Sequence, residues 1–214
     1  MNRFRVIFQR GPQLKYISHL DLIRLWHRAM RRARVGLAYT LGFNPHPRLT
    51  LAAPLQLGAT GLGELMDVWL DKPVVPGQFT ARLERQLPDG LRIIRVAGVA
   101  PGLPALQAQV RYSDYRVTVE TRDEVALRKS ISSTLASSSI PWRHQRDTGF
   151  KAYDIRPLIK TIELESVSHG VATLDMRLRS DASGTGRPEQ VVKALGMDIP
   201  VDICRTGLVL GSAL

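Results

Sequence analysis

Two sets of side chains near the N-terminus are candidates for ligand binding or catalysis: a row of arginines and a group of histidines. Residues 1–48 hold ten basic side chains and one acid, Asp21. Guanidinium groups spaced three and four residues apart on one helix face can contact successive phosphates. We therefore predict a nucleic-acid-binding surface. Its expected residues are Lys15, Tyr16, His19, Arg24, Arg28, Arg31, Asn44, His46 and Arg48.

The predicted surface divides into three kinds of contact. Lysine and arginine side chains would hold phosphates: Lys15, Arg24, Arg28, Arg31 and Arg48. Asn44 and His46 would read the shape of the nucleic acid or a base edge. Aromatic rings can stack on bases, and the candidates are Tyr16, Tyr39 and Phe43. The alternative is an exposed, charged helix face with no ligand, as many α/β proteins have.

The histidines open a second possibility, RNA cleavage without a metal. Such cleavage needs a base for the 2′-hydroxyl, an acid for the leaving oxygen and cations for the phosphate. His19 and His46 are the candidate pair. His27 lies eight residues after His19, roughly 12 Å along a helix, which is too far for one metal ion. The structural alternative is that His19 forms local hydrogen bonds and His46 stiffens a proline-rich loop.

Three further residues are candidates for contact with a partner: Asp154, Arg156 and Arg187. Asp154 and Arg156 lie in KAYDIRPLI, where a turn stabilised by the aspartate is an equally good interpretation. Arg187 follows a glycine-rich stretch, SGTGRP, whose backbone N–H groups could hold a phosphate before a helix. That stretch and a similar one, GATGLG at residues 58–63, could equally be flexible loops.

The arginine row requires a helix and a sheet to position it. Residues 3–9 alternate apolar and polar side chains, as a half-buried strand does, with Phe4, Val6 and Phe8 on one face. Ser18 and Asp21 indicate the start of a helix that reaches about residue 34. Its apolar stripe consists of Leu22, Trp26, Ala29 and Ala33. Strand, strand, helix and strand are then predicted at residues 48–54, 62–70, 76–87 and 91–99.

This β-α-β-β-α-β order is typical of a ferredoxin-like sandwich and recurs in the second half. The repeat is predicted as a strand at 112–120, a helix at 123–136, a short strand or loop at 140–145, a strand pair at 158–166 and 171–178, a helix at 187–195 and a strand at 202–210. We therefore predict an α+β fold with two ferredoxin-like sandwiches in tandem, each with an antiparallel sheet. The expected parts are a basic domain at 1–100, a linker at 101–111 and a second domain at 112–214.

Composition restricts the class of protein. The net charge is +11, of which residues 1–110 contribute +9 and residues 111–214 contribute +2. A concentrated positive charge attracts and steers polyanions. Cys204 is the only cysteine, so neither an intramolecular disulfide nor a cysteine-rich metal cluster can form. The sequence contains no run of about 18 apolar residues, so it predicts no membrane span. We expect a cytoplasmic protein.

Several stretches together resemble a known family: KYISHLDLIRLWHRAMRRA, LAYTLGFNPHPRLTLAAPLQLG, ELMDVWL, KAYDIRPLI and GRPEQVVKALG. They are similar to the radical-SAM-associated proteins, a domain of unknown function found beside or fused to cobalamin-binding radical SAM enzymes. The resemblance implies such an enzyme as partner, which would carry the iron–sulfur cluster, S-adenosylmethionine and cobalamin. This chain lacks the CxxxCxxC motif, so we expect no cofactor in it and no radical SAM catalysis by it.

We expect a non-catalytic accessory protein that binds structured RNA, such as tRNA or rRNA, through its basic N-terminal face. Two alternatives remain at this point. One is a metal-independent endoribonuclease that uses His19 and His46. The other is a protein-interaction module that contacts only an acidic face of the radical SAM enzyme.

Overall fold

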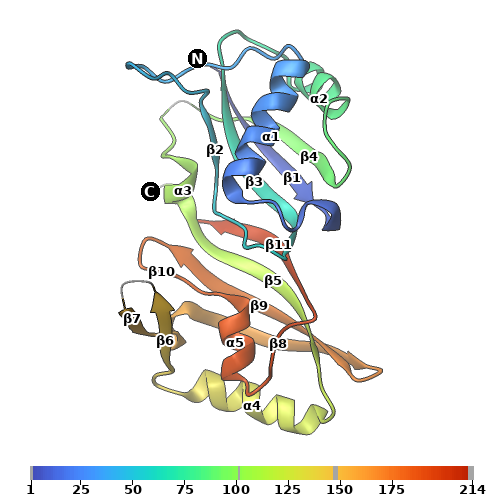
Figure 1. Cartoon of the computed structure of the whole chain (residues 1–214), viewed down its shortest axis with the longest axis vertical. Coiled ribbons are helices and arrows are strands. Elements are labelled where there is room, and N and C mark those ends of the chain that lie inside the picture. Colours follow the sequence, from blue (N-terminus) through green and yellow to red (C-terminus); the bar gives the residue numbers. More distant parts are fainter. Residues whose placement is uncertain (1, 101, 147–148, 212–214) are drawn as a thin grey trace. The chain divides into compact units, whose positions relative to one another are not determined.

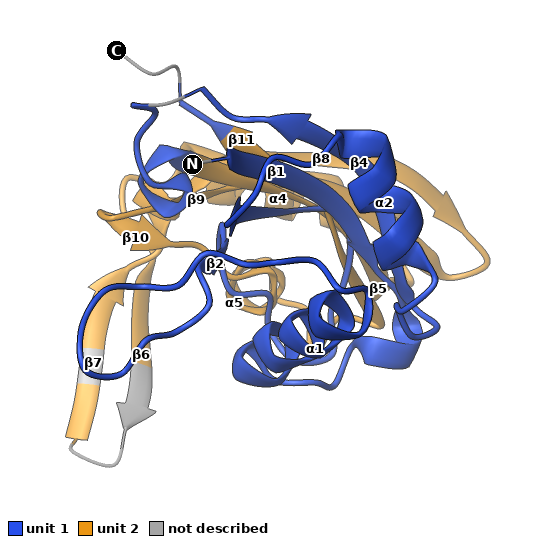
Figure 2. Ribbon diagram, turned by 90° about the horizontal axis from the view of Figure 1, so that it is seen from above, with its two compact units in different colours: residues 1–110, 210–214 blue, residues 111–209 orange. Residues whose placement is uncertain are grey.

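The chain forms two compact units in the computed structural model, which describes residues 2–100, 102–146 and 149–211. Unit 1 comprises residues 1–110 and 210–214, and unit 2 comprises residues 111–209 (Figure 2). The boundary lies inside one strand, where Val110 ends the first unit and Arg111 begins the second. Both units mix helices with antiparallel strands, which agrees with the helices and antiparallel sheets that the sequence predicted.

Unit 1 repeats the predicted element order (Figure 1). Its elements are β1 (Asn2–Arg10), the short 3-10 helix η1 (Pro12–Leu14), α1 (His19–Arg32), β2 (Leu49–Leu51), β3 (Thr60–Leu70), α2 (Pro76–Glu84), β4 (Leu91–Gly98) and α3 (Leu106–Gln109). The strands pair antiparallel in the order β2-β3-β1-β4. Helices α1 and α2 cover the same face of this sheet.

The core of unit 1 forms between that sheet face and the two helices. The predicted face of β1, Phe4, Val6 and Phe8, is buried. Phe8 meets Trp26 of α1 edge-on, with ring centroids 5.0 Å apart, and Phe4 meets Phe79 of α2 at 5.5 Å. Aromatic pairs in this geometry stabilise a core beyond the area they bury. The strand and helix that carry the arginine row are therefore fixed against each other.

The other face of the sheet carries a buried ion network. Asp67 of β3 is fully buried and pairs with Arg3 and Arg5 of β1, whose side chains are only 11% and 17% exposed. Arg3 also donates to the backbone carbonyls of Leu103 and Pro104. This polar face is thus covered by the segment that precedes α3, and Leu106 of α3 is fully buried.

Unit 2 repeats the strand–helix order with one hairpin added. Its elements are β5 (Val110–Glu120), α4 (Glu124–Ala136), β6 (Pro141–Arg146), β7 (Gly149–Asp154), the 3-10 helix η2 (Arg156–Leu158), β8 (Ile159–Ser168), β9 (Val171–Asp181), β10 (Gly184–Thr185), α5 (Pro188–Ala194) and β11 (Asp202–Leu210). Four strands lie in the order β8-β9-β5-β11. The hairpin β6–β7 forms a separate two-stranded sheet.

Two local expectations need correction, and a third is confirmed with an addition. The strand predicted at residues 48–54 covers only Leu49–Leu51, because Pro54 lacks a backbone N–H and the chain leaves the ladder before it. The stretch at 140–145, predicted as a strand or a loop, is the first strand of the β6–β7 hairpin, whose second strand went unpredicted. The expected linker contains helix α3. In the described part of the chain, no helix is long and apolar enough to cross a membrane.

Candidate nucleic-acid interface

Helix α1 presents the predicted arginine row to solvent. The helix starts as expected, since the Ser18 hydroxyl accepts a hydrogen bond from the backbone N–H of Asp21 at 3.1 Å. Arg24, Arg28 and Arg31 follow at four- and three-residue spacing, and all three are exposed. The row spans roughly 10 Å along the helix, comparable to a few phosphate spacings. Arg24 also forms an ion pair within the helix, to Asp21 at 3.0 Å.

A protruding hairpin, here called the arm (residues 38–48), follows α1. The backbone N–H of Arg48 donates to the carbonyl of Ala38 at 2.8 Å, and the backbone N–H of Thr40 donates to the carbonyl of His46 at 2.9 Å. The His46 N–H in turn donates to the hydroxyl of Thr40. These bonds close the base and middle of the arm, although the sequence contains two prolines and a glycine.

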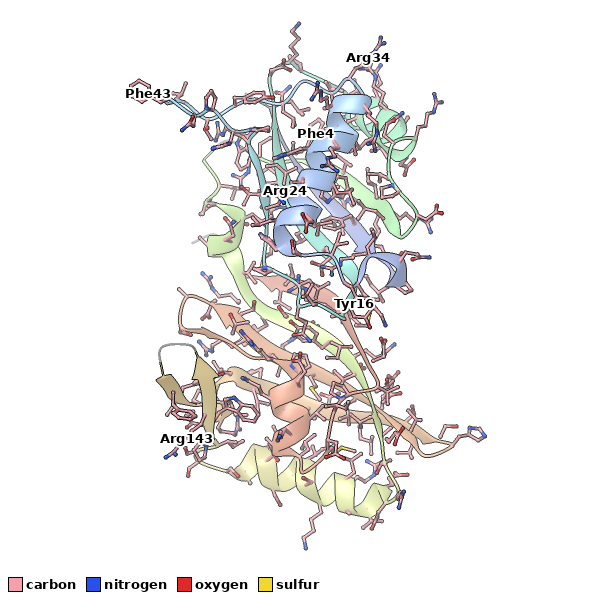
Figure 3. All side chains as sticks on the ribbon, in the orientation of Figure 1. Phe4, Tyr16, Arg24, Arg34, Phe43 and Arg143 are labelled. Carbon is pink, nitrogen blue, oxygen red and sulfur yellow. The ribbon has the colours of Figure 1, made fainter. Side chains whose placement is uncertain are left out.

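The tip of the arm is apolar and completely exposed. Leu41 and Phe43 have 101% and 105% of their reference surface in solvent, and Tyr39 has 56%. Figure 3 shows the Phe43 ring pointing away from the body of unit 1. Asn44 and His46 of the arm are exposed as well. The tip therefore offers planar and polar side chains to solvent.

Trp69 of β3 anchors the root of the arm. The guanidinium of Arg48 lies over the Trp69 ring at 4.7 Å, and that of Arg3 lies over the same ring at 5.0 Å. Cations over an indole face are attracted by its π electrons. Arg48 is therefore half-buried and held in place, so the structure gives it a positioning role that the sequence did not indicate.

The first predicted residues of the surface, Lys15 and Tyr16, lie just before α1. The Tyr16 ring is 73% exposed, and the Lys15 ammonium lies over it at 5.2 Å. The Lys15 carbonyl accepts from the Gly58 N–H at 2.8 Å, so GATGLG packs beside this pair. Gly58 has a φ of 84°, a left-handed conformation that favours glycine. The backbone conformation therefore explains why a glycine stands at this position.

The histidine that the structure couples to His46 is His27. Burial lowers the pKa of His27, and the nearby His46 lowers it further. Its Nε2 is buried without a hydrogen-bond partner in the described residues. His27 lies on the flank of α1 beside the arginine row, a position that helical spacing alone could have indicated. His19 is the first residue of α1, and its pairing with His46 stays a prediction.

Not every basic side chain of the first 48 residues is available to a ligand. Arg3 and Arg5 are held by Asp67. Arg10 is buried and donates to the carbonyls of Leu14, Lys15 and Ile17. Arg32 donates to the Gln86 carbonyl at 2.6 Å. The sequence count of ten cations therefore overstates the charge free to meet a ligand, because composition does not distinguish buried from exposed arginines.

Two of the three candidate partner contacts in unit 2, Asp154 and Arg156, are engaged within the chain. Asp154 accepts from the backbone N–H groups of Ile140 and Arg156, which lowers its pKa. Arg156 donates to the carbonyls of Leu135 and Ile159. These bonds favour the structural interpretation of KAYDIRPLI.

Arg187 is exposed at the start of α5, which has only seven residues. In the adjoining SGTGRP stretch, a Cβ on Gly186 would lie 2.9 Å from Leu178 and 3.0 Å from the Leu158 carbonyl. The glycine is therefore required by packing. Among the described residues, no group of histidine, cysteine, aspartate and glutamate side chains could hold a metal ion.

Comparison with known proteins places most of this chain in one family. Residues 3–188 match the family described as an uncharacterized protein conserved in bacteria (DUF2344). The chain belongs to this family. The family description gives a domain of unknown function, as the resemblance implied, and carries no link to radical SAM enzymes. No curated protein matches the chain.

Solved structures of similar fold come from protein complexes named for Cbf5 and Nop10. A Cbf5-Nop10-Gar1 complex aligns with a TM-score of 0.56 at 8% identity, over 96% of this chain and 48% of the other. The archaeal box H/ACA sRNP Nop10-Cbf5 complex aligns with a TM-score of 0.51 at 11% identity, over 96% and 48%. The chain thus spans about half the length of these chains, and the likeness concerns the fold alone.

Proposed function

We propose that this protein binds RNA through the α1–arm face, defined as Arg24, Arg28 and Arg31 of α1 together with the arm, residues 38–48. The observation that carries the proposal is an exposed arginine row beside an ordered arm with aromatic side chains. Cations supply sequence-independent affinity for phosphates, and exposed rings can stack on bases.

The charge distribution along the sequence supports a polyanion as ligand. Residues 22–63 contain six arginines and no aspartate or glutamate. This stretch includes most of α1 and the whole arm, so its own residues bring no negative charge to the face. The choice of RNA over DNA follows the similarity in fold to a complex that is named as an sRNP.

We propose further that each unit is a ferredoxin-like sandwich. In both units, the fourth strand of the β-α-β-β-α-β order pairs with the first strand, and the third strand lies between the first and the second. The four strands are β1, β2, β3 and β4 in unit 1 and β5, β8, β9 and β11 in unit 2. This order supports the tandem that the sequence predicted, with β6–β7 as an insertion. An accessory role beside a radical SAM enzyme stays a prediction from the family resemblance.

The proposal is tested by measuring RNA affinity against salt concentration. For a fluorescently labelled structured RNA, the logarithm of the association constant should fall linearly with the logarithm of salt. Replacing Arg24, Arg28 and Arg31 with alanine should reduce that slope by about 0.7–0.9 for each phosphate that the variant no longer neutralises. Arg143→Ala, an exposed arginine of unit 2 (Figure 3), is the matched control and should leave the slope unchanged.

Two results would contradict the proposal. One is an affinity for RNA that hardly changes between low and high salt. The other is a triple variant whose slope equals that of the Arg143 variant, since the row would then bind no phosphates. Circular dichroism on each variant checks that the fold is retained.

A further inference from the structure

We propose that the tip of the arm binds an unpaired nucleobase, so that the protein prefers RNA with a loop, bulge or single-stranded segment over a continuous duplex. This inference rests on the proposed RNA binding and specifies the class of RNA. The residues that it assigns are Phe43, as the ring that stacks on the base, and Leu41, as an apolar contact beside it.

The exposed tip of the arm stands on a base that hydrogen bonds hold in place. The pairs Ala38–Arg48 and Thr40–His46 close the arm below the tip, and the Ala38 N–H donates to the Trp69 carbonyl of β3 at 2.8 Å. Arg48 lies over the Trp69 ring at the same root. A preorganised arm loses little conformational entropy when it binds, which favours affinity.

The side chains at the tip of the arm are apolar, and one of them is aromatic. A leucine and a phenylalanine that are both fully exposed, two residues apart, cost solvation free energy unless a ligand covers them. Unpaired bases of RNA are commonly recognised by stacking on aromatic side chains. Paired bases inside a helix are stacked on each other and present no free face. A ring on a protruding arm therefore suits a base that is already outside a helix.

The charge of the surrounding residues distinguishes RNA from a protein as the occupant of the tip. Phe43 lies in a stretch of 42 residues, from 22 to 63, that contains no acidic side chain. Exposed arginines of α1 and the exposed His46 lie in the same stretch. A phosphate backbone next to the stacked base would be attracted by these groups, whereas a protein partner would have to supply a matching acidic surface. The charge complementarity favours the nucleic acid.

The test compares two labelled RNAs of equal length, a hairpin with an unpaired loop and a continuous duplex, by fluorescence polarisation. The native protein should bind the hairpin more tightly. Phe43→Ala should weaken hairpin binding roughly 5- to 150-fold, the range expected when one stacked base loses its ring. It should leave duplex binding and the salt slope unchanged. Phe43→Trp should retain the preference, because an indole stacks as well.

Phe150→Ala is the matched control, because Phe150 is 75% exposed on β7 of unit 2. This variant should bind both RNAs as the native protein does. A 2-aminopurine base in the loop gives an independent readout, since its fluorescence should change on binding to the native protein and not to the Phe43→Ala variant.

Failure of the inference is distinct from failure of the proposed function. Equal hairpin affinity for the native protein and Phe43→Ala, with salt-dependent binding in both, overturns the unpaired-base site and leaves the arginine row intact. A loss of protein capture in Phe43→Ala with unchanged RNA affinity would assign the tip to a protein partner and also overturns the inference. Absence of binding to either RNA overturns the proposed function itself.

Discussion

Replacing Asp67 with asparagine should destabilise unit 1 strongly. The carboxylate is fully buried and accepts from Arg3 Nε at 2.9 Å and from Arg5 Nε at 2.8 Å, with a further bond from each guanidinium. The variant keeps the shape but leaves two poorly exposed cations opposite a neutral amide. Removing one partner of a buried ion pair costs about 3–5 kcal/mol.

The structure favours the lower end of that range. Arg3 retains the carbonyls of Leu103 and Pro104, and Arg5 retains the Gln109 amide oxygen at 3.3 Å. We therefore expect a loss of about 3 kcal/mol in the free energy of unfolding. For a chain of this length, that corresponds to a fall in melting temperature of about 6–12 °C.

Urea unfolding followed by tryptophan fluorescence measures this loss in unit 1. Trp26 and Trp69 lie in unit 1, and a Trp142→Phe background removes the signal from unit 2. Asp89→Asn, the same chemical change at an exposed position, is the control and should cost less than about 0.5 kcal/mol. A loss below about 1 kcal/mol for Asp67→Asn would refute the argument, because the network would then contribute no more than a surface pair.

Removal of the whole ion network should have a smaller effect than loss of the Asp67 charge alone. Arg3→Met, Arg5→Met and Asp67→Leu together should destabilise less than Asp67→Asn alone, because no charge is left buried without a partner. A larger loss in the triple variant would show that packing, and not charge, dominates this site.

Three further predictions concern single residues. Ser18→Ala should cost about 1 kcal/mol in the free energy of unfolding, measured in urea, because the α1 cap is removed. Burial lowers the pKa of His27 in the folded state, so the unfolded chain binds more protons and stability should fall as the pH drops through about 6.5. A series of melting temperatures against pH should lose this dependence in His27→Gln. The control His169→Asn, at an exposed position, should keep it. Gly186→Ala should cost about 1–3 kcal/mol by thermal unfolding, because its Cβ would clash with Leu158 and Leu178. Gly207→Ala is the control, because a Cβ there meets no described atom within 4 Å.

Local patterns predicted the elements that carry the candidate site. Alternation placed Phe4, Val6 and Phe8 on the core face of β1, and the Ser18–Asp21 pair located the start of α1. Helical spacing put the arginine row on the solvent face, away from the buried Trp26. These features depend on neighbours within a few residues, so periodicity and capping chemistry are sufficient to find them.

What the sequence could not give is the partner of each charge. Arg3 and Arg28 are the same residue type, yet one meets a buried Asp67 that lies 64 residues away and the other faces solvent. The contact of Arg48 with Trp69 and the proximity of His46 to His27 depend in the same way on how distant segments pack. Local sequence patterns were sufficient to predict the elements, the faces of α1 and β1 and the excess of positive charge. Long-range packing fixes which cations face solvent and where the arm points, because strand pairing and burial join residues whose separation in the chain carries no signal.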